Sequence, residues 1–210
     1  MAVLIDRFQK IHGDATKQIG RYFCIPATLC NALRLFGVAD CTQERIRDEW
    51  YTENRKTVEP SIDDQMEDAG FVIRETMERR MDCMNDVHKS CFSLSGDKDP
   101  IDLSKADLAL EFVENHINTD HPVIVSTWNR VYNGDTIKIQ GYHMWLLLDF
   151  DKAANTAVYH DSGTDLVTKI PITSCEPVIL KGKNYQLDKG LKGCITHSDY
   201  SCLALWKDPA

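Results

Sequence analysis

The segment 18–37, QIGRYFCIPATLCNALRLFG, constrains the fold more than any other part of the chain. Its apolar residues recur at the spacing of one face of an α-helix. These residues are Ile25, Leu29, Leu33 and Phe36. Proline fits only the first turn of a helix, and glycine favours the position just after the last turn. Pro26 and Gly37 therefore predict a buried helix from Cys24 to Phe36, with a thiol at its first residue.

The size and charge of the chain exclude several classes of protein. It has 210 residues, of which 43% are hydrophobic, and a formal net charge of −8. This length suits one domain, so we expect a single domain over residues 1–210. The negative charge and the lack of a basic stripe argue against nucleic-acid binding. No apolar run reaches the roughly 18 residues that a transmembrane helix needs, so no membrane span is expected.

The N-terminal sequence and the cysteines bear on location and on metals. MAVLIDRFQKIHGD lacks the basic region and the apolar core of a secretory signal peptide. We therefore expect a cytoplasmic protein, or one secreted without a cleavable signal peptide. Most of the eight cysteines are then expected to be reduced. Because no C-x-x-C pair occurs and no Cys/His cluster has structural zinc spacing, the sequence predicts neither a metal nor a cofactor.

The first half of the chain has helical signals and the second half has strand signals. Capping signals predict a helix from Asp40 with Gln43 to about Trp50, a short helix from Ser61 to Gly70, and a helix over 105–117 capped by Ser104. FVIRET (71–76) is typical of a strand, and MDCMNDVHKSCFSL (81–94) is compatible with a helix.

The strand signals are short apolar or β-branched runs. They lie at 122–128, 143–150, 156–161, 176–180 and 201–207, with a turn at DKAAN and a Lys- and Gly-rich loop before the last run. Helices followed by an antiparallel sheet predict an α+β fold. We expect a helical N-terminal part whose central helix packs on the sheet.

The position of Cys24 favours a reactive thiol. Peptide dipoles and free N–H groups at a helix N-terminus stabilise a thiolate. Cys30 lies in the middle of the same helix and lacks this effect. A nucleophilic cysteine also needs a base within hydrogen-bond reach, and that base can be distant in sequence.

His143 is the candidate base among the seven histidines. It opens the most apolar predicted strand, in QGYHMWLLLDFD. If this strand pairs with TAVYHD as a hairpin, the start of the first strand meets the end of the second, and His143 lies beside Asp161 or its neighbour. A carboxylate there orients an imidazole and stabilises its charged form. His160 is the alternative base, in a different hairpin register.

Acyl chemistry also needs donors that face the developing oxyanion. The backbone N–H of Cys24 at the helix start is one such donor. Gln18 lies six residues before Cys24, so its side-chain amide is a candidate for the second.

In this order the residues resemble the papain-like cysteine peptidases, whose parts follow as Gln, Cys, His and then Asn or Asp. Gln18, Cys24, His143 and Asp161 match that order, and the gap of six residues from Gln to Cys is the usual one. The likeness is closest to the branch of bacteriocin-leader-processing peptidases and covers about 15–165. CIPATLCNAL, HPVIVSTW, GYHMWLLLDFD and VYHDSG carry it.

Some positions depart from that branch. Ser162 follows the aspartate where proline is usual, and Ile25 follows the cysteine where glycine is common. Residues 78–100 and 166–210 match no part of the pattern and are left unassigned.

The resemblance implies a papain-like fold and a cysteine peptidase. Such an enzyme cleaves peptide or other amide bonds through a thioester acyl-enzyme, with a Cys24–His143–Asp161 triad and Gln18 at the oxyanion, on a protein or peptide substrate. Two alternatives stay open at this point. One is a transglutaminase, deamidase or acyltransferase of the same fold, such as a bacterial effector, and the other is a binding protein without turnover.

Overall fold

The structure is a computed structural model. It describes residues 3–20, 23–38, 41–46, 87–92, 94, 103–133, 136–195 and 201–208. The helices are α1 (Val3–Gln9), α2 (Cys24–Arg34), α5 (Ala106–Ile117) and α6 (Leu191–Cys194). The strands are β1 (Val87–Phe92), β2 (Val123–Asn133), β3 (Thr136–Asp151), β4 (Thr156–Asp161), β5 (Leu166–Pro171), β6 (Cys175–Leu180), β7 (Lys183–Asp188) and β8 (Cys202–Lys207).

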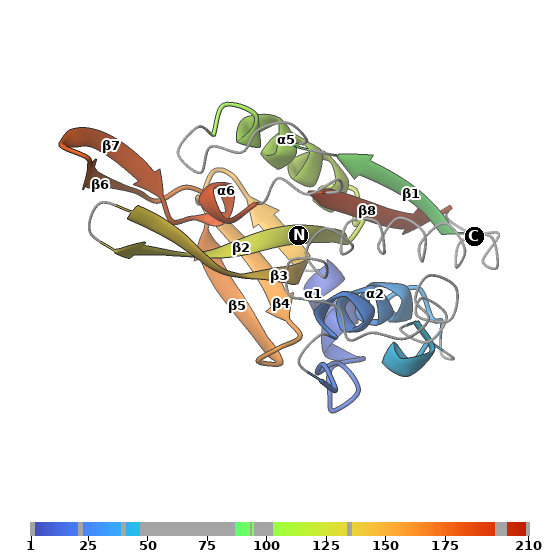
Figure 1. Cartoon of the computed structure of the whole chain (residues 1–210). Helices are drawn as coiled ribbons and strands as arrows, with labels where there is room; N and C mark the ends of the chain where they lie inside the picture. Colours follow the sequence, from blue (N-terminus) through green and yellow to red (C-terminus); the bar gives the residue numbers. More distant parts are fainter. Residues whose placement is uncertain are drawn as a thin grey trace.

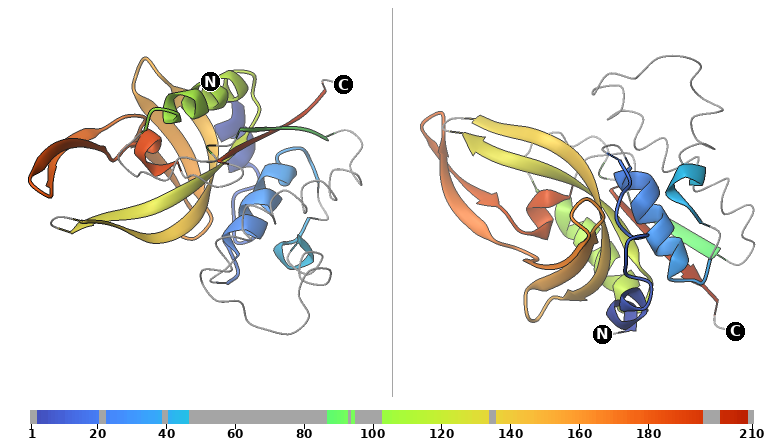
Figure 2. Two further views of the ribbon diagram at one scale, coloured as in Figure 1. Left: turned by 45° about the horizontal axis from the view of Figure 1, so that its top comes forward. Right: turned by 90° about the horizontal axis from the view of Figure 1, so that it is seen from below.

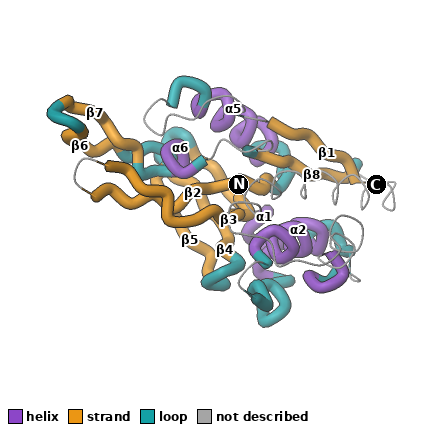
Figure 3. Tube along the Cα trace, in the orientation of Figure 1, coloured by secondary structure: helices purple, strands orange, loops and turns teal. Residues whose placement is uncertain are grey.

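An antiparallel sheet forms the centre of the described part (Figure 1). Its strand order is β1-β8-β2-β3-β4-β5, and β6 and β7 form a separate two-stranded ribbon. Figure 3 shows the strands and the helices as distinct groups. The predicted α+β class is therefore confirmed, and this arrangement is compatible with a papain-like fold.

Helices cover both sides of the sheet. α5 lies on one side, and α1 and α2 lie on the other, as the view from below in Figure 2 shows. The core that joins these layers includes Phe8 of α1, Leu33 of α2 and Val113 of α5. Each side chain buried in this way contributes about 1.5–3 kcal/mol to stability.

The predicted central helix forms and packs on β3. α2 begins at Cys24, carries Pro26 in its first turn and is followed by Gly37, whose φ is +78°. The helix ends at Arg34, two residues earlier than predicted. Thr28, one turn after Cys24, donates a hydrogen bond of 3.3 Å from Oγ1 to the carbonyl of Met144. This bond fixes the start of α2 against the part of β3 that follows His143.

Four predicted strands are observed as β2, β4, β6 and β8, and the run at 143–150 forms the second half of β3. The hairpin turn at 151–155 is confirmed: Asn155 has a φ of +53°, and the Ala154 N–H donates to Asp151 Oδ1 at 2.9 Å. None of the described helices is long and apolar enough to cross a membrane.

Several local predictions are wrong. Residues 87–92 form β1, not a helix, and residues 183–188 form β7, not a loop. Among the described residues each of these strands pairs along one edge, and neither shows the regular alternation of buried and exposed residues that marks a strand in sequence. The N-cap of α5 is Lys105 and not Ser104. The helix predicted over 61–70, the strand predicted over 71–76 and the predicted end of a helix at 47–50 lie outside the described residues.

Candidate active site

His143 and Asp161 lie together as the hairpin prediction required. His143 Nε2 is 2.6 Å from Asp161 Oδ1. The side chains are 26% and 19% exposed, so the pair is partly shielded from water but open to a substrate. β4 ends at Asp161, while β3 continues past His143 toward Thr136. The imidazole therefore lies at a corner of the sheet where the neighbouring strand stops.

A one-residue irregularity in the hairpin creates this pairing. Asp149 pairs with Val158, but the register shifts at Leu148, so that Trp145 pairs with Asp161. Without the extra residue Asp161 would lie opposite Leu146, and its side chain would point to the other face of the sheet. The shift places Asp161 on the face of Trp145 and therefore of His143, because residues two apart in a strand share a face.

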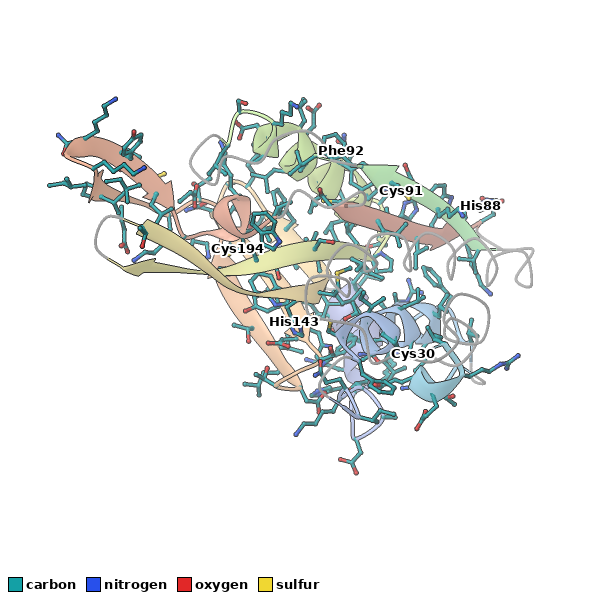
Figure 4. All side chains as sticks on the ribbon, viewed as in Figure 1. Cys30, His88, Cys91, Phe92, His143 and Cys194 are labelled. Carbon is teal, nitrogen blue, oxygen red and sulfur yellow. The ribbon has the colours of Figure 1, made fainter. Side chains whose placement is uncertain are left out.

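Cys24 lies at the N-terminus of α2 and contacts His143. Its side chain is partly buried and packs against the core without being enclosed by it. Figure 4 labels His143 where β3 runs beside α2, the helix on which Cys30 is labelled. Burial alone would lower the pKa of His143, but hydrogen bonds with Asp161 and with Cys24 raise that pKa to about 9. The ring is therefore charged through neutral pH.

Asp161 is held in its ionised form. Burial would raise the pKa of Asp161, but the hydrogen bond with His143 and backbone N–H groups of Gly163 and Thr164 lower that pKa. The Gly163 N–H donates to Asp161 Oδ1 at 2.7 Å. A Cβ at Gly163 would lie 3.1 Å from that same oxygen and 3.5 Å from His143 Nε2, so glycine leaves room for the pair.

Gln18 lies on the loop that leads to α2. Its Nε2 donates to the Gly20 carbonyl at 2.9 Å, and the same carbonyl accepts the N–H of Phe23 at 3.2 Å. The backbone N–H of Gln18 donates to the Ser162 carbonyl at 2.9 Å. Gln18 is thus tied through its backbone to Ser162, the residue after Asp161, and through its side chain to Gly20, four residues before Cys24.

His160, the alternative base, points away from this group. It pairs with Leu146 across the hairpin, and its buried ring lies 3.1 Å from Asp165 Oδ1 and packs on Phe8. Burial lowers the pKa of His160 more than the hydrogen bond with Asp165 raises it. This geometry does not favour His160 as a partner of Cys24.

The sequence model of the Peptidase_C39 like family matches residues 6–183, well over half of the chain. The chain belongs to the Peptidase_C39 like family. A search of curated proteins found no significant match. Membership of this family supports a cysteine-peptidase-like function.

The family match extends beyond the resemblance seen in the sequence. It begins before residue 15 and continues past residue 165, so it includes most of α1 together with β5 and β6. Residues 166–183, unassigned from the sequence, therefore lie within the family match. Ser162 stands where proline was expected, and its backbone carbonyl is the group that holds Gln18.

Gln43 has a role that the sequence did not indicate. The capping box was predicted from Asp40 with Gln43, and Asp40 lies outside the described residues; the Arg45 N–H donates to Thr42 Oγ1 at 3.2 Å. Gln43 is 3% exposed, and its side chain accepts the Ile19 N–H at 3.1 Å and donates to the Lys17 carbonyl at 2.6 Å. These two residues flank Gln18, so Gln43 holds the loop on both sides of that amide.

Proposed function

We propose that this protein is a cysteine peptidase in which Cys24 is the nucleophile, His143 the acid and base, and Asp161 the residue that orients the ring. The observation that carries the proposal is the 2.6 Å contact of His143 with Asp161 beside the first residue of α2. Acyl transfer by a thiol requires an activated nucleophile, a base that contacts it, and a carboxylate that orients the base.

The two ring nitrogens of His143 contact different neighbours, and this determines how the proton moves in the reaction. Nε2 of His143 is engaged by Asp161, so Nδ1 is the nitrogen left for Cys24. The imidazolium beside the helix start stabilises the thiolate, which attacks the carbonyl carbon of an amide. Nδ1–H then protonates the leaving amine, and the acyl group remains on Cys24 as a thioester. Water, deprotonated by the neutral ring, hydrolyses the thioester, which releases the acid and restores the Cys24 thiolate beside the His143 imidazolium.

The developing oxyanion needs donors in a fixed position. The Cys24 N–H at the start of α2 supplies one. Gln18 supplies the second from its amide, after the substrate carbonyl displaces or supplements the contact with Gly20. Gln43 and Ser162 hold the Gln18 loop in position for this role.

Two finer points belong to the same proposal. The motif order supports a place close to the bacteriocin-leader-processing branch, with a peptide or protein as substrate. The packing of α1, α2 and α5 on one sheet supports a single domain over residues 1–210.

Replacing Gln18 with alanine is expected to lower kcat by about 10²-fold or more, the usual loss when one oxyanion donor is removed. The rate at which iodoacetamide alkylates Cys24 should change little, because alkylation forms no oxyanion. Steady-state kinetics and alkylation rates on Q18A and on a matched Lys17→Ala variant check this. Equal turnover by the two variants would show that Gln18 takes no part in the reaction.

The simplest test of the proposal compares the alkylation rates of all the cysteines in one sample of the protein. Limiting iodoacetamide near neutral pH, followed by peptide mapping, gives an alkylation rate for each cysteine. Cys24 is expected to react much faster than the other seven, because among the described cysteines it alone combines a helix N-terminus with a charged imidazole. Uniform slow labelling of all eight would favour a binding protein and would count against catalysis.

A further inference from the structure

Three ligand-type side chains converge behind the His143–Asp161 pair, on the opposite face of β4. His12 follows α1, His160 lies on β4, and Asp165 closes the turn between β4 and β5. Each residue offers one ligand atom, a ring nitrogen or a carboxylate oxygen, and these three atoms all lie within 4.8 Å of one another. Among the described residues this is the one group of histidine, cysteine and carboxylate side chains with that spacing.

The distances within the group are close to those of a metal site. His160 Nε2 is 3.1 Å from Asp165 Oδ1, and His12 Nε2 is 3.4 Å from it. Bonds of about 2.0–2.2 Å at a tetrahedral angle separate neighbouring ligand atoms by roughly 3.3–3.5 Å. We propose that His12, His160 and Asp165 form a binding site for a divalent cation of the zinc class.

A bound cation would take the place of hydrogen bonds within the group. Asp165 Oδ1 lies 2.8 Å from Thr16 Oγ1 and 3.1 Å from His160 Nε2. The hydrogen bond of His12 Nε2 is to the backbone carbonyl of Asp165, at 3.2 Å. A cation held by the two ring nitrogens and the carboxylate satisfies these groups together, and the Thr16 hydroxyl then supports the carboxylate from outside.

The donor set selects the kind of metal. Two imidazoles and one carboxylate suit zinc and its late first-row neighbours, whereas calcium and magnesium prefer oxygen ligands alone. Three protein ligands leave a fourth position for water or another ligand. His12 is 35% exposed in its side chain, so the ion reaches the site from that side, whereas the His160 side chain is fully buried.

The site would fasten the N-terminal segment to the turn that carries part of the active site. Phe8 of α1 packs on both imidazoles, with ring centroids 5.5 Å from His12 and 4.6 Å from His160. The Asp165 N–H donates to the Asp161 carbonyl at 2.7 Å, which closes the turn. A bound cation thereby links α1 to the turn that begins at Asp161 without touching the His143–Asp161 pair.

Sequence spacing could not have predicted this site. Structural zinc motifs are recognised by ligands a few residues apart, but His12 and His160 are separated by 148 residues and meet only through the packing of α1 on β4. The sequence predicted no metal because it lacks ligands at structural zinc spacing. The present proposal replaces that prediction.

The experiment is a calorimetric titration of zinc chloride into the full chain carrying Cys24→Ala, freshly reduced and free of chelators. The substitution removes Cys24 as a competing thiolate ligand, and the titration needs no turnover, so its outcome is independent of the peptidase proposal. One zinc ion per chain is expected. His12→Ala, at an accessible position, should weaken the affinity by about 100-fold or more, beyond the loss caused by an outer-sphere partner.

Two comparisons make the result decisive. His88→Ala is the matched control, because His88 Nε2 also contacts a carboxylate, Asp208, at 2.9 Å, but no third ligand from the described part of the chain joins that pair. It should bind zinc as the parent does, and Asp165→Asn should lose affinity as His12→Ala does. Cobalt substitution should give a spectrum of tetrahedral nitrogen and oxygen ligation. The proposal is overturned by absence of binding, by affinity equal in His12→Ala and the parent, or by a thiolate-to-cobalt charge-transfer band.

Discussion

Replacement of Cys24 with alanine is expected to abolish peptide cleavage. The substitution removes the atom that forms the thioester, and without it neither His143 nor the oxyanion donors have a reaction to assist. The loss in kcat/KM should be on the order of 10⁴-fold or more, because members of a catalytic triad act as a unit. A peptide library incubated with each protein and analysed by mass spectrometry for new termini measures this.

Cys30→Ala is the control for that experiment. Cys30 lies on the same helix as Cys24 but is fully buried in the core. Its loss should lower stability, because a small cavity is left, and should leave cleavage by the folded protein unchanged. Thermal unfolding of both variants separates the two effects. An inactive but folded Cys30→Ala protein, together with an active Cys24→Ala protein, would show that the wrong thiol has been assigned.

Replacement of His143 with glutamine is expected to lower kcat/KM by about 10³-fold or more, because the general base and the charge beside the thiolate are both lost. The pH dependence gives a second readout. With a pKa of about 9, His143 in the parent protein stays protonated from acidic pH through neutrality and loses its proton only as the pH rises through 9. The rate of Cys24 alkylation should therefore change little with pH between the ordinary histidine range and about 9.

In the His143→Gln protein the same rate should rise steadily with pH, because no imidazolium stabilises the thiolate. His88→Gln serves as the control and should keep the flat profile of the parent. The charged ring also contributes to stability with a definite sign. Its folded-state pKa is raised, so this contribution is full below the ordinary histidine pKa and is lost as the pH rises through about 9. A parent profile as steep as that of the variant would contradict the proposed pair.

The central helix could be predicted from sequence because its signals are local. Pro26, Gly37 and the spacing of Leu29 and Leu33 each depend on residues within a few turns of one another. They fix where α2 begins, and hence that a thiol stands at its N-terminus. The hairpin of β3 and β4 was predictable for the same reason, because its strands are joined by a short turn.

The register within that hairpin was not predictable. The extra residue at Leu148 decides whether Asp161 or His160 shares a face with His143, and nothing in the run LLLD marks where a bulge will fall. The sequence therefore left both residues as candidates. The packing of α1, with Phe8 against His160, accompanies the register in which Asp161 faces His143.

Contacts between residues far apart in the chain also could not be predicted from the sequence. β8 inserts between β1 and β2, and no local pattern indicates which earlier strands a C-terminal strand will join. Gln43 presented a similar difficulty. Its spacing from Asp40 fits a helix cap, but the side chain holds a loop more than twenty residues earlier, where it bonds to the backbone of Lys17 and Ile19.

Detection of the acyl-enzyme tests the central claim most directly. A peptide that the library shows to be cleaved is mixed with the parent protein, the reaction is quenched in acid within the first turnovers, and the digest is mapped by mass. The acyl part of the peptide should be found on Cys24 as a hydroxylamine-sensitive thioester, and should be missing from the Cys24→Ala and His143→Gln proteins. An acyl group on any other cysteine, or cleavage without a covalent intermediate, would contradict it.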